Sequence, residues 1–120
     1  MIKTFKELIA WQEAMNLVEM TYQETKNFPK EELYGLTSQI RRAVVSIPAN
    51  IAEGNGRKSR KEYLHFLSIS NGSLKELETH ILIAERLKYI SIEKSDKLQA
   101  KLQTVSRLVS GLRNSLLPNP

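Results

Sequence analysis

Apolar residues recur at every third or fourth position along most of the chain, and this spacing constrains the fold more than any other feature of the sequence. A 3-4 repeat places apolar side chains on one face of an α-helix. Four stretches carry the repeat, and no stretch shows the alternation that is typical of a β-strand. The sequence therefore predicts an all-α protein, an up-down-up-down antiparallel four-helix bundle. In this prediction residues 1–120 form a single domain, with a short tail at 117–120.

Three of the predicted helices have a start signal as well as an apolar stripe. Thr4 with Glu7, and Ser59 with Glu62, form capping-box patterns, and Ser91 is the expected N-cap of the last helix. The first stripe comprises Leu8, Trp11, Met15, Val18 and Tyr22. The third and fourth stripes comprise Leu67, Ser70, Leu74, Leu77, Ile81 and Ala84, and then Leu98, Leu102, Val105, Val109, Leu112 and Leu116.

The second predicted helix runs from about Glu32 to Glu53 and contains a proline. Its stripe comprises Leu36, Ile40, Ala43 and Ile47, widened by Val44 and Ile51. Pro48 has no N–H and its ring clashes with the carbonyl of Val44, which costs about 3 kcal/mol in a helix interior. A new helix that started at Pro48 would have only about two turns before Gly54, and so short a helix is marginal alone. We therefore expect one continuous helix kinked at Pro48, with Gly54 in the left-handed position just past its end.

The polar residues near the end of this helix have two interpretations. Asn50 falls on the apolar stripe, and a buried amide needs hydrogen-bond partners, for which the carbonyl freed by Pro48 is a candidate. Glu53 lies in the last turn, where the helix dipole disfavours an anion, so we expect Arg57 or Arg60 to offset its charge. In the first interpretation Asn50 and Glu53 form a structural polar clamp at the corner between the second and third helices. In the second interpretation the same residues contact a ligand.

The third predicted helix carries two unusual features. Gly72 in its interior costs roughly 1 kcal/mol relative to alanine, so we expect another helix to approach closely there. From Ile81 to Ile90 the sequence is apolar on nearly every side, which predicts burial on more than one face. This surplus favours a subunit interface over scattered surface apolar residues, and it predicts a homo-oligomer.

Positive charge is in excess and is unevenly distributed. The chain has 18 Lys and Arg against 13 Asp and Glu, a formal net charge of +5. This excess suits an acidic partner, with nucleic acid ahead of a membrane surface or an acidic protein, although it also aids solubility. No aromatic residue interleaves with the densest run, at 57–61, so contacts with a phosphate backbone fit better than base stacking. The cations of interest are Arg41, Arg42, Arg57, Lys58, Arg60 and Lys61, with a further row at Lys94, Lys97 and Lys101.

Few residues suit catalysis or metal binding. The chain has no cysteine, which excludes disulfides, thiolate metal sites and a cysteine nucleophile, and fits a cytoplasmic protein. Glu62 and His65 form one Glu-x-x-His motif, but Leu77 stands three residues before His80, so the second motif of a di-iron bundle is missing. No nucleophile elbow or phosphate-binding glycine loop is present. We therefore expect no enzyme activity, no cofactor, no metal and, for lack of a long apolar run, no membrane span or signal peptide.

Residues 28–78 resemble the signature of the bacterial four-helix bundle proteins that are encoded by intervening sequences within 23S rRNA genes, the S23-like family. Trp11 and residues 87–90 also fit, so the resemblance covers nearly the whole chain. Asn55 and Ser70 depart from the aromatic and alanine residues that are commoner there, which leaves the branch of the family open. The matching positions are Tyr34, Gly35, Leu36, Gln39, Arg41, Arg42, Ala43, Ser46, Ile47, Asn50, Ile51, Glu53, Gly54, Arg57, Phe66, Leu67, Gly72, Ser73 and Glu76.

The resemblance implies a bundle that assembles into a homo-pentameric ring, with no known activity for most members. For a related branch, the accessory protein of diversity-generating retroelements, it implies a basic surface that binds nucleic acid and a reverse transcriptase. We predict a non-enzymatic, oligomeric protein that contacts the backbone of nucleic acid, RNA in particular, through the six cations at 41, 42, 57, 58, 60 and 61. The alternative is a protein-interaction scaffold that docks a partner enzyme such as a reverse transcriptase.

Overall fold

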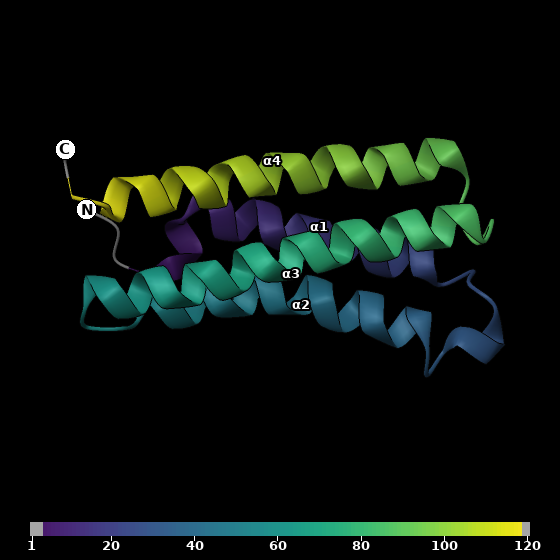
Figure 1. Cartoon of the computed structure of the whole chain (residues 1–120), viewed down its shortest axis with the longest axis horizontal. Helices are drawn as coiled ribbons and strands as arrows, with labels where there is room; N and C mark the ends of the chain where they lie inside the picture. The colour runs from purple at the N-terminus through teal and green to yellow at the C-terminus, as the bar shows by residue number, and fades with distance from the viewer. Residues whose placement is uncertain (1–3, 119–120) are drawn as a thin grey trace.

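The computed structural model describes residues 4–118, which form an antiparallel bundle of four α-helices (Figure 1). The helices are α1 (Ile9–Thr25), α2 (Leu36–Asn55), α3 (Arg60–Arg86) and α4 (Ile92–Leu116), with single 3-10 turns at η1 (Phe5–Glu7) and η2 (Lys30–Glu32). No strand occurs within residues 4–118. The all-α fold predicted from the sequence is confirmed. The last two residues of the predicted tail, Asn119 and Pro120, lie outside the described residues.

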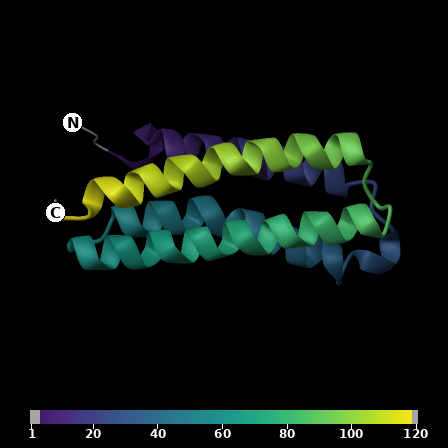
Figure 2. The same ribbon diagram turned by 45° about the horizontal axis from the view of Figure 1, so that its top comes forward.

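Each helix packs against two neighbours, so that α1 and α3 each contact both α2 and α4. Figure 2 shows α1 and α4 as one layer and α2 and α3 as the other. The bundle is long and narrow, with extents of 45 × 24 × 21 Å. The α2–α3 corner lies at the same end as the start of α1 and the end of α4, whereas the other two connections lie at the opposite end (Figure 1).

The apolar stripes predicted for α3 and α4 are confirmed, as are their N-caps. All six predicted positions from Leu67 to Ala84 are buried, and so are the first four predicted positions of α4. Ser59 accepts a hydrogen bond from the Glu62 N–H, and Ser91 accepts one from the Lys94 N–H. Together with the buried residues of α2, these stripes form the centre of the core: Leu36, Ile40, Ala43, Val44, Ile47 and Ile51.

The stripe predicted for α1 is confirmed only at its first residue, Leu8, because the helix buries a neighbouring face instead of the predicted one. Met15 and Tyr22, which were expected inside, are exposed, and Trp11 and Val18 are only partly buried. The predicted capping box is wrong as well, since Thr4 caps η1, and α1 begins later without a side-chain cap. Small residues dominate the true buried face, which suits close approach to α2 and α4; the face comprises Ala10, Ala14, Leu17, Thr21 and Thr25.

Helix α2 runs without interruption through Pro48, as predicted, although it begins at Leu36 instead of near Glu32. The prediction that Gly54 adopts a left-handed conformation just past the end of α2 is wrong. The helix continues past Gly54, and its C-cap, Gly56, has a φ of −82°, which is ordinary helical backbone. The end of α2 therefore needs no special backbone conformation.

Gly54 is required by packing. A Cβ at this position would lie 2.9 Å from the Cβ of Phe66 and 3.2 Å from the backbone oxygen of Tyr63. Both contacts belong to α3, and neither atom is the free end of a flexible side chain. The absence of a side chain at Gly54 thus permits α2 and α3 to approach at their shared corner.

Two expectations for α3 need correction. Gly72 is exposed, and a Cβ there would meet no atom within 4 Å, so no helix approaches it. Part of the apolar surplus belongs to the core of a single chain, because Ile90 is buried. Leu82, Ile83 and Leu87 remain between 40% and 51% exposed, and they form the apolar surface that the fold leaves uncovered.

A contact that the sequence analysis did not anticipate closes the end of the bundle opposite the α2–α3 corner. Glu32 Oε1 accepts a hydrogen bond from the Leu36 N–H at 3.1 Å, which caps α2, and Oε2 accepts one from the Tyr89 hydroxyl at 2.8 Å. These bonds, that from Leu36 first, lower the pKa of the Glu32 carboxyl, and the same pairing raises the pKa of Tyr89. Gly35 leaves room for the cap, since a Cβ there would lie 2.6 Å from Glu32 Oε1.

We expect the Glu32→Gln variant to melt at a lower temperature than the wild type at neutral pH and to show less loss of stability in acid. The pKa of the carboxyl is lowered in the folded state, so its contribution is complete above its ordinary pKa of 4.5. That contribution is lost as the pH falls through the lowered value. Circular dichroism melts between about pH 7 and pH 3 measure both effects. Glu31→Gln, at the exposed neighbouring residue, is the control, and a Glu32 variant that behaves like this control would contradict the prediction.

Candidate nucleic-acid interface

The densest cluster of positive charge lies at the α2–α3 corner, at one end of the bundle (Figure 1). Gly56 ends α2, and Ser59 starts α3 by accepting a hydrogen bond from the Glu62 N–H at 3.1 Å. The connection is so short that its cations and those of the first turn of α3 crowd together. All four are exposed: Arg57, Lys58, Arg60 and Lys61.

Arg57 is engaged in holding the corner. Its Nη2 lies 3.5 Å from Glu53 Oε1, and its Nη1 lies 3.8 Å from Glu62 Oε2. Its Cζ lies 4.7 Å from the centre of the Phe66 ring, a cation–π contact. Arg57 therefore offsets the anion at the end of α2, as one of the two expected partners of Glu53. Arg60, the other expected partner, does not pair with Glu53.

Lys58, Arg60 and Lys61 are the free cations of the corner. Each is exposed, and none forms an ion pair with any residue of the range 4–118. They also flank the N-terminus of α3, where the helix dipole adds positive potential. Three unpaired cations beside a helix N-terminus form a surface that suits phosphate groups. We call these three residues the corner trio.

Arg41 and Arg42 belong to a different surface from the corner trio. Arg42 precedes Arg57 by about 15 residues, which corresponds to roughly 22 Å along a helix. Arg41 is held in place, because its Nε donates to Thr25 Oγ1 at 3.0 Å and its Cζ lies 4.7 Å from the centre of the Tyr22 ring. Arg42 is exposed. The structure thus separates the six predicted contact residues into the corner and an arginine pair on α2.

Asn50 lies in a polar cluster that joins α2 to α3. Its Nδ2 donates to the backbone oxygen of Ser46 at 2.8 Å and to Ser46 Oγ at 2.9 Å. From α3, Ser73 Oγ donates to Ser46 Oγ at 2.9 Å, and the buried Ser70 hydroxyl donates to the backbone oxygen of Ile47 at 2.9 Å. The two serine bonds join α3 to α2 near Pro48, whereas both bonds of Asn50 stay within α2, where they give its amide hydrogen-bond partners.

Two details of the predicted clamp differ from expectation. Asn50 does not use the carbonyl of Val44, because the backbone and side-chain oxygens of Ser46 lie one turn away on the same side of α2. Glu53 takes no part in the cluster around Asn50. Its side chain is 55% exposed and pairs with Arg57, so it stabilises the corner separately.

Replacing Asn50 by alanine should lower the free energy of unfolding by about 0.5–1.5 kcal/mol relative to the same change at Asn71, because its hydrogen bonds are lost. Asn71 is the matched control: it is half-buried in α3, and within the described chain its side chain has no hydrogen-bond partner. Alanine also favours helix over asparagine, so Asn71→Ala should leave stability unchanged or slightly raised. Urea denaturation of both variants measures the difference, and equal values would mean that the Asn50 bonds contribute nothing.

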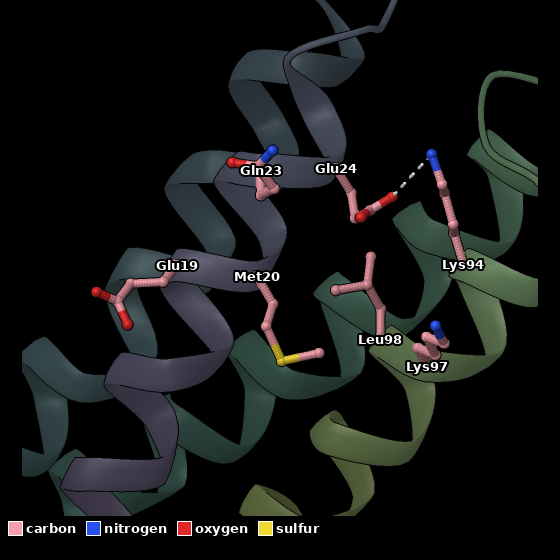
Figure 3. Close-up of a pocket in the computed structure, with 7 residues that line it drawn as sticks. All are labelled: Glu19, Met20, Gln23, Glu24, Lys94, Lys97 and Leu98. Carbon is pink, nitrogen blue, oxygen red and sulfur yellow. Dashed lines mark ion pairs between the residues drawn. The ribbon is translucent and has the colours of Figure 1, made fainter.

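Two of the three lysines of α4 pair with carboxylates of α1, and Lys97 stays unpaired within residues 4–118. Lys94 Nζ lies 3.9 Å from Glu24 Oε2 of α1, and Lys101 pairs with Glu13, which lowers the pKa of that carboxyl. Figure 3 shows the hollow beside the first pair, with Met20 and Leu98 between the two helices and charged groups on both sides. Because α1 supplies carboxylates opposite these lysines, the surface has mixed charge and suits a polyanion poorly.

Catalytic and metal-binding groups are sparse. Within residues 4–118, no three His, Asp or Glu side chains lie close enough together to hold a metal ion. His65 and His80 stand about 15 residues apart on α3, roughly 22 Å, so they cannot act on one substrate atom. None of the described helices is both long and apolar enough to cross a membrane.

One exposed aromatic residue was named among the family-matching positions but was not predicted as a contact residue. Tyr34, in the connection before α2, is 93% exposed. The sequence signal for its exposure was its position outside every predicted apolar stripe and next to Gly35. Its surroundings include both Arg41 and Arg42.

The fold and the corner define a small helical-bundle protein with a cationic end. The model of the 23S rRNA-intervening sequence proteins matches residues 6–111. The chain therefore belongs to the 23S rRNA-intervening sequence protein family.

A solved structure shares this fold. It is a protein of unknown function from the S23 ribosomal protein family of Bacteroides thetaiotaomicron VPI-5482, and it superposes with a TM-score of 0.79. The two sequences are 20% identical, and the match covers 88% of this chain and 98% of that chain. At this identity the likeness shows the fold alone. No curated protein matches the sequence.

Proposed function

We propose that the protein is a non-enzymatic, oligomeric nucleic-acid-binding protein, with RNA as its favoured ligand. The observation that carries the proposal is the corner trio: three exposed cations without an acidic partner in the described chain, beside the N-terminus of a 27-residue helix. Phosphates bound there release counterions, which supplies affinity without reading the sequence. Arg57 positions the corner, and Arg42 provides a second contact along α2.

The name of the family refers to 23S rRNA through the place of its genes, so RNA as the ligand class rests on the phosphate-binding chemistry of the corner trio. Oligomerisation is supported by the uncovered apolar residues of α3, namely Leu82, Ile83 and Leu87. In the proposal the copies form a ring, with five subunits as the resemblance implies. The protein acts in the cytoplasm, because a chain without cysteine forms no disulfides and needs no oxidising compartment. Light scattering at micromolar concentration tests this part, and a monomer would contradict it.

A protein-interaction scaffold is the second candidate function. The same apolar residues of α3 favour a scaffold function if a partner enzyme, such as a reverse transcriptase, covers them instead of a second copy. In this candidate the positive charge only aids solubility. The two functions differ in one property: a scaffold has no salt-dependent affinity for nucleic acid.

Titration of the wild-type protein with a structured RNA at several salt concentrations tests the proposed function. Each phosphate contact contributes a log–log slope of about 0.7 to 0.9, so the corner trio should give a slope of about 2 or more. Absence of binding at low salt, or binding that is indifferent to salt, would leave the scaffold as the remaining candidate.

A further inference from the structure

A shallow hollow lies on the outer side of α2, at the end of the bundle opposite the corner trio. It has a volume of about 440 Å³, within the roughly 300–1,000 Å³ typical of small-molecule sites. Its lining combines aromatic, apolar and cationic side chains, including Tyr22, Leu33, Tyr34, Arg41, Arg42 and Val45. We call it the Tyr34 hollow.

Tyr34 is the unusual residue of this hollow. At 93% exposed, its ring is almost completely open to solvent, although a tyrosine normally buries much of its surface. Leu33, next to it in the chain, and Val45, further along α2, are 48% and 42% exposed and add apolar surface to the hollow. A tyrosine has only two side-chain torsions, so little conformational entropy is lost when a flat group packs on it.

The charged residues that line the hollow have one sign. None of the residues that line the hollow is acidic, and neither Arg41 nor Arg42 forms an ion pair within residues 4–118. Arg41 is already fixed by Thr25 and by the Tyr22 ring, so its position costs little to organise. The hollow therefore favours a ligand that combines a flat ring with an adjacent anion.

We propose that the Tyr34 hollow holds one unpaired nucleobase of a single-stranded segment, with the base stacked on Tyr34 and its phosphate bound by Arg42. Aromatic residues combined with cations are the usual means of binding single strands. The inference rests on the proposed function and deepens it, because it adds a base-dependent contact to the backbone contacts of the corner trio. Arg42 and Lys58 are separated by roughly 24 Å along α2, so one strand of about a dozen nucleotides reaches both surfaces.

The test compares an unstructured RNA of about 12 nucleotides with the duplex of the same sequence, by fluorescence anisotropy at fixed salt. Tyr34→Leu should weaken binding of the single strand by about 5- to 100-fold and leave duplex binding unchanged, because only the unpaired base can stack. Tyr34→Phe keeps the ring and should bind both ligands as the wild type does. Ile92→Ala, at a residue that is 67% exposed at the start of α4 and at the same end of the bundle, is the control for a general surface effect.

The outcomes separate this inference from the proposed function. If both RNAs bind with salt dependence but Tyr34→Leu changes neither affinity, the hollow holds no base and only the further inference falls. If Tyr34→Leu changes the mass in light scattering and leaves RNA affinity unchanged, a second copy covers the hollow, which also overturns the inference. If single-strand binding depends on Tyr34 but not on the corner trio, the inference stands and the proposed corner site falls. If neither RNA binds at low salt, both fall.

Discussion

The Gly54→Ala variant should be less stable than the wild type by about 1–3 kcal/mol, the usual cost of overpacking. The added methyl group would lie 2.9 Å from the Cβ of Phe66 and 3.0 Å from Cδ1 of Tyr63. These atoms are anchored to α3, so α2 and α3 must move apart at the corner to accommodate it. Alanine favours helix by up to about 1 kcal/mol over glycine, but that gain does not offset the loss of packing between two helices.

Gly72→Ala is the matched control, since it makes the same change inside α3 where no atom lies within 4 Å of the new Cβ. This variant should be more stable than the wild type, by up to about 1 kcal/mol. Urea denaturation at one protein concentration gives both values, and the fixed concentration removes any effect of subunit association. Two variants that shift stability in the same direction would contradict the close approach at Gly54.

Simultaneous replacement of Lys58, Arg60 and Lys61 by glutamine should weaken RNA binding by about tenfold or more at about 50 mM salt, and should lower the log–log slope by about 2. The reason is that each of these cations is exposed and free of acidic partners in the described chain, so each is available to a phosphate. The three side chains are in solvent, so the fold and the melting temperature should be retained.

The matched control removes the same amount of charge elsewhere, by replacing Arg86, Lys97 and Arg107 with glutamine. These residues are exposed on α3 and α4, outside the corner. The control should keep most of the affinity and most of the slope. If both triple variants lose affinity equally, the net charge of the protein attracts RNA and the corner has no special role.

The sequence predicted three of the four core faces because apolar size and helical spacing agree in α2, α3 and α4. In α1 two sets of residues follow the same repeat, and the set with the larger side chains misled the prediction. Ala14 and Thr21 are buried where Met15 and Tyr22 were expected, since small residues permit close packing against two neighbouring helices. Spacing alone does not distinguish two such faces that lie about 100° apart.

The glycines illustrate a similar limit. Gly54 precedes a loop, which suggested a left-handed helix end, and Gly72 lies beside two serines, which suggested close packing. The structure shows close packing at Gly54 and open space at Gly72. The difference depends on which residue of another helix lies opposite, and a single sequence contains no direct record of that.

The sequence predicted which cations the candidate site contains, but not which of them remain unpaired at the surface. Sequence placed Arg57 next to three other cations, yet the fold neutralises it with Glu53 and Glu62. The arginines of α2 are sequence neighbours, but Arg41 is fixed by Thr25 whereas Arg42 is exposed. Ion pairing and helix rotation decide which cations remain available, and both depend on tertiary contacts.

The most direct test of the corner as a nucleic-acid interface is formaldehyde crosslinking in cells, followed by purification of the protein and mapping of the crosslinked peptides. Formaldehyde joins lysine amines to nucleic acid, and the corner trio contains two lysines, Lys58 and Lys61. We predict that RNA is recovered with the protein and that its crosslinks concentrate in the peptide that contains residues 57–61. Recovery of the protein without nucleic acid, or crosslinks confined to the lysines of α4, would contradict the proposed interface.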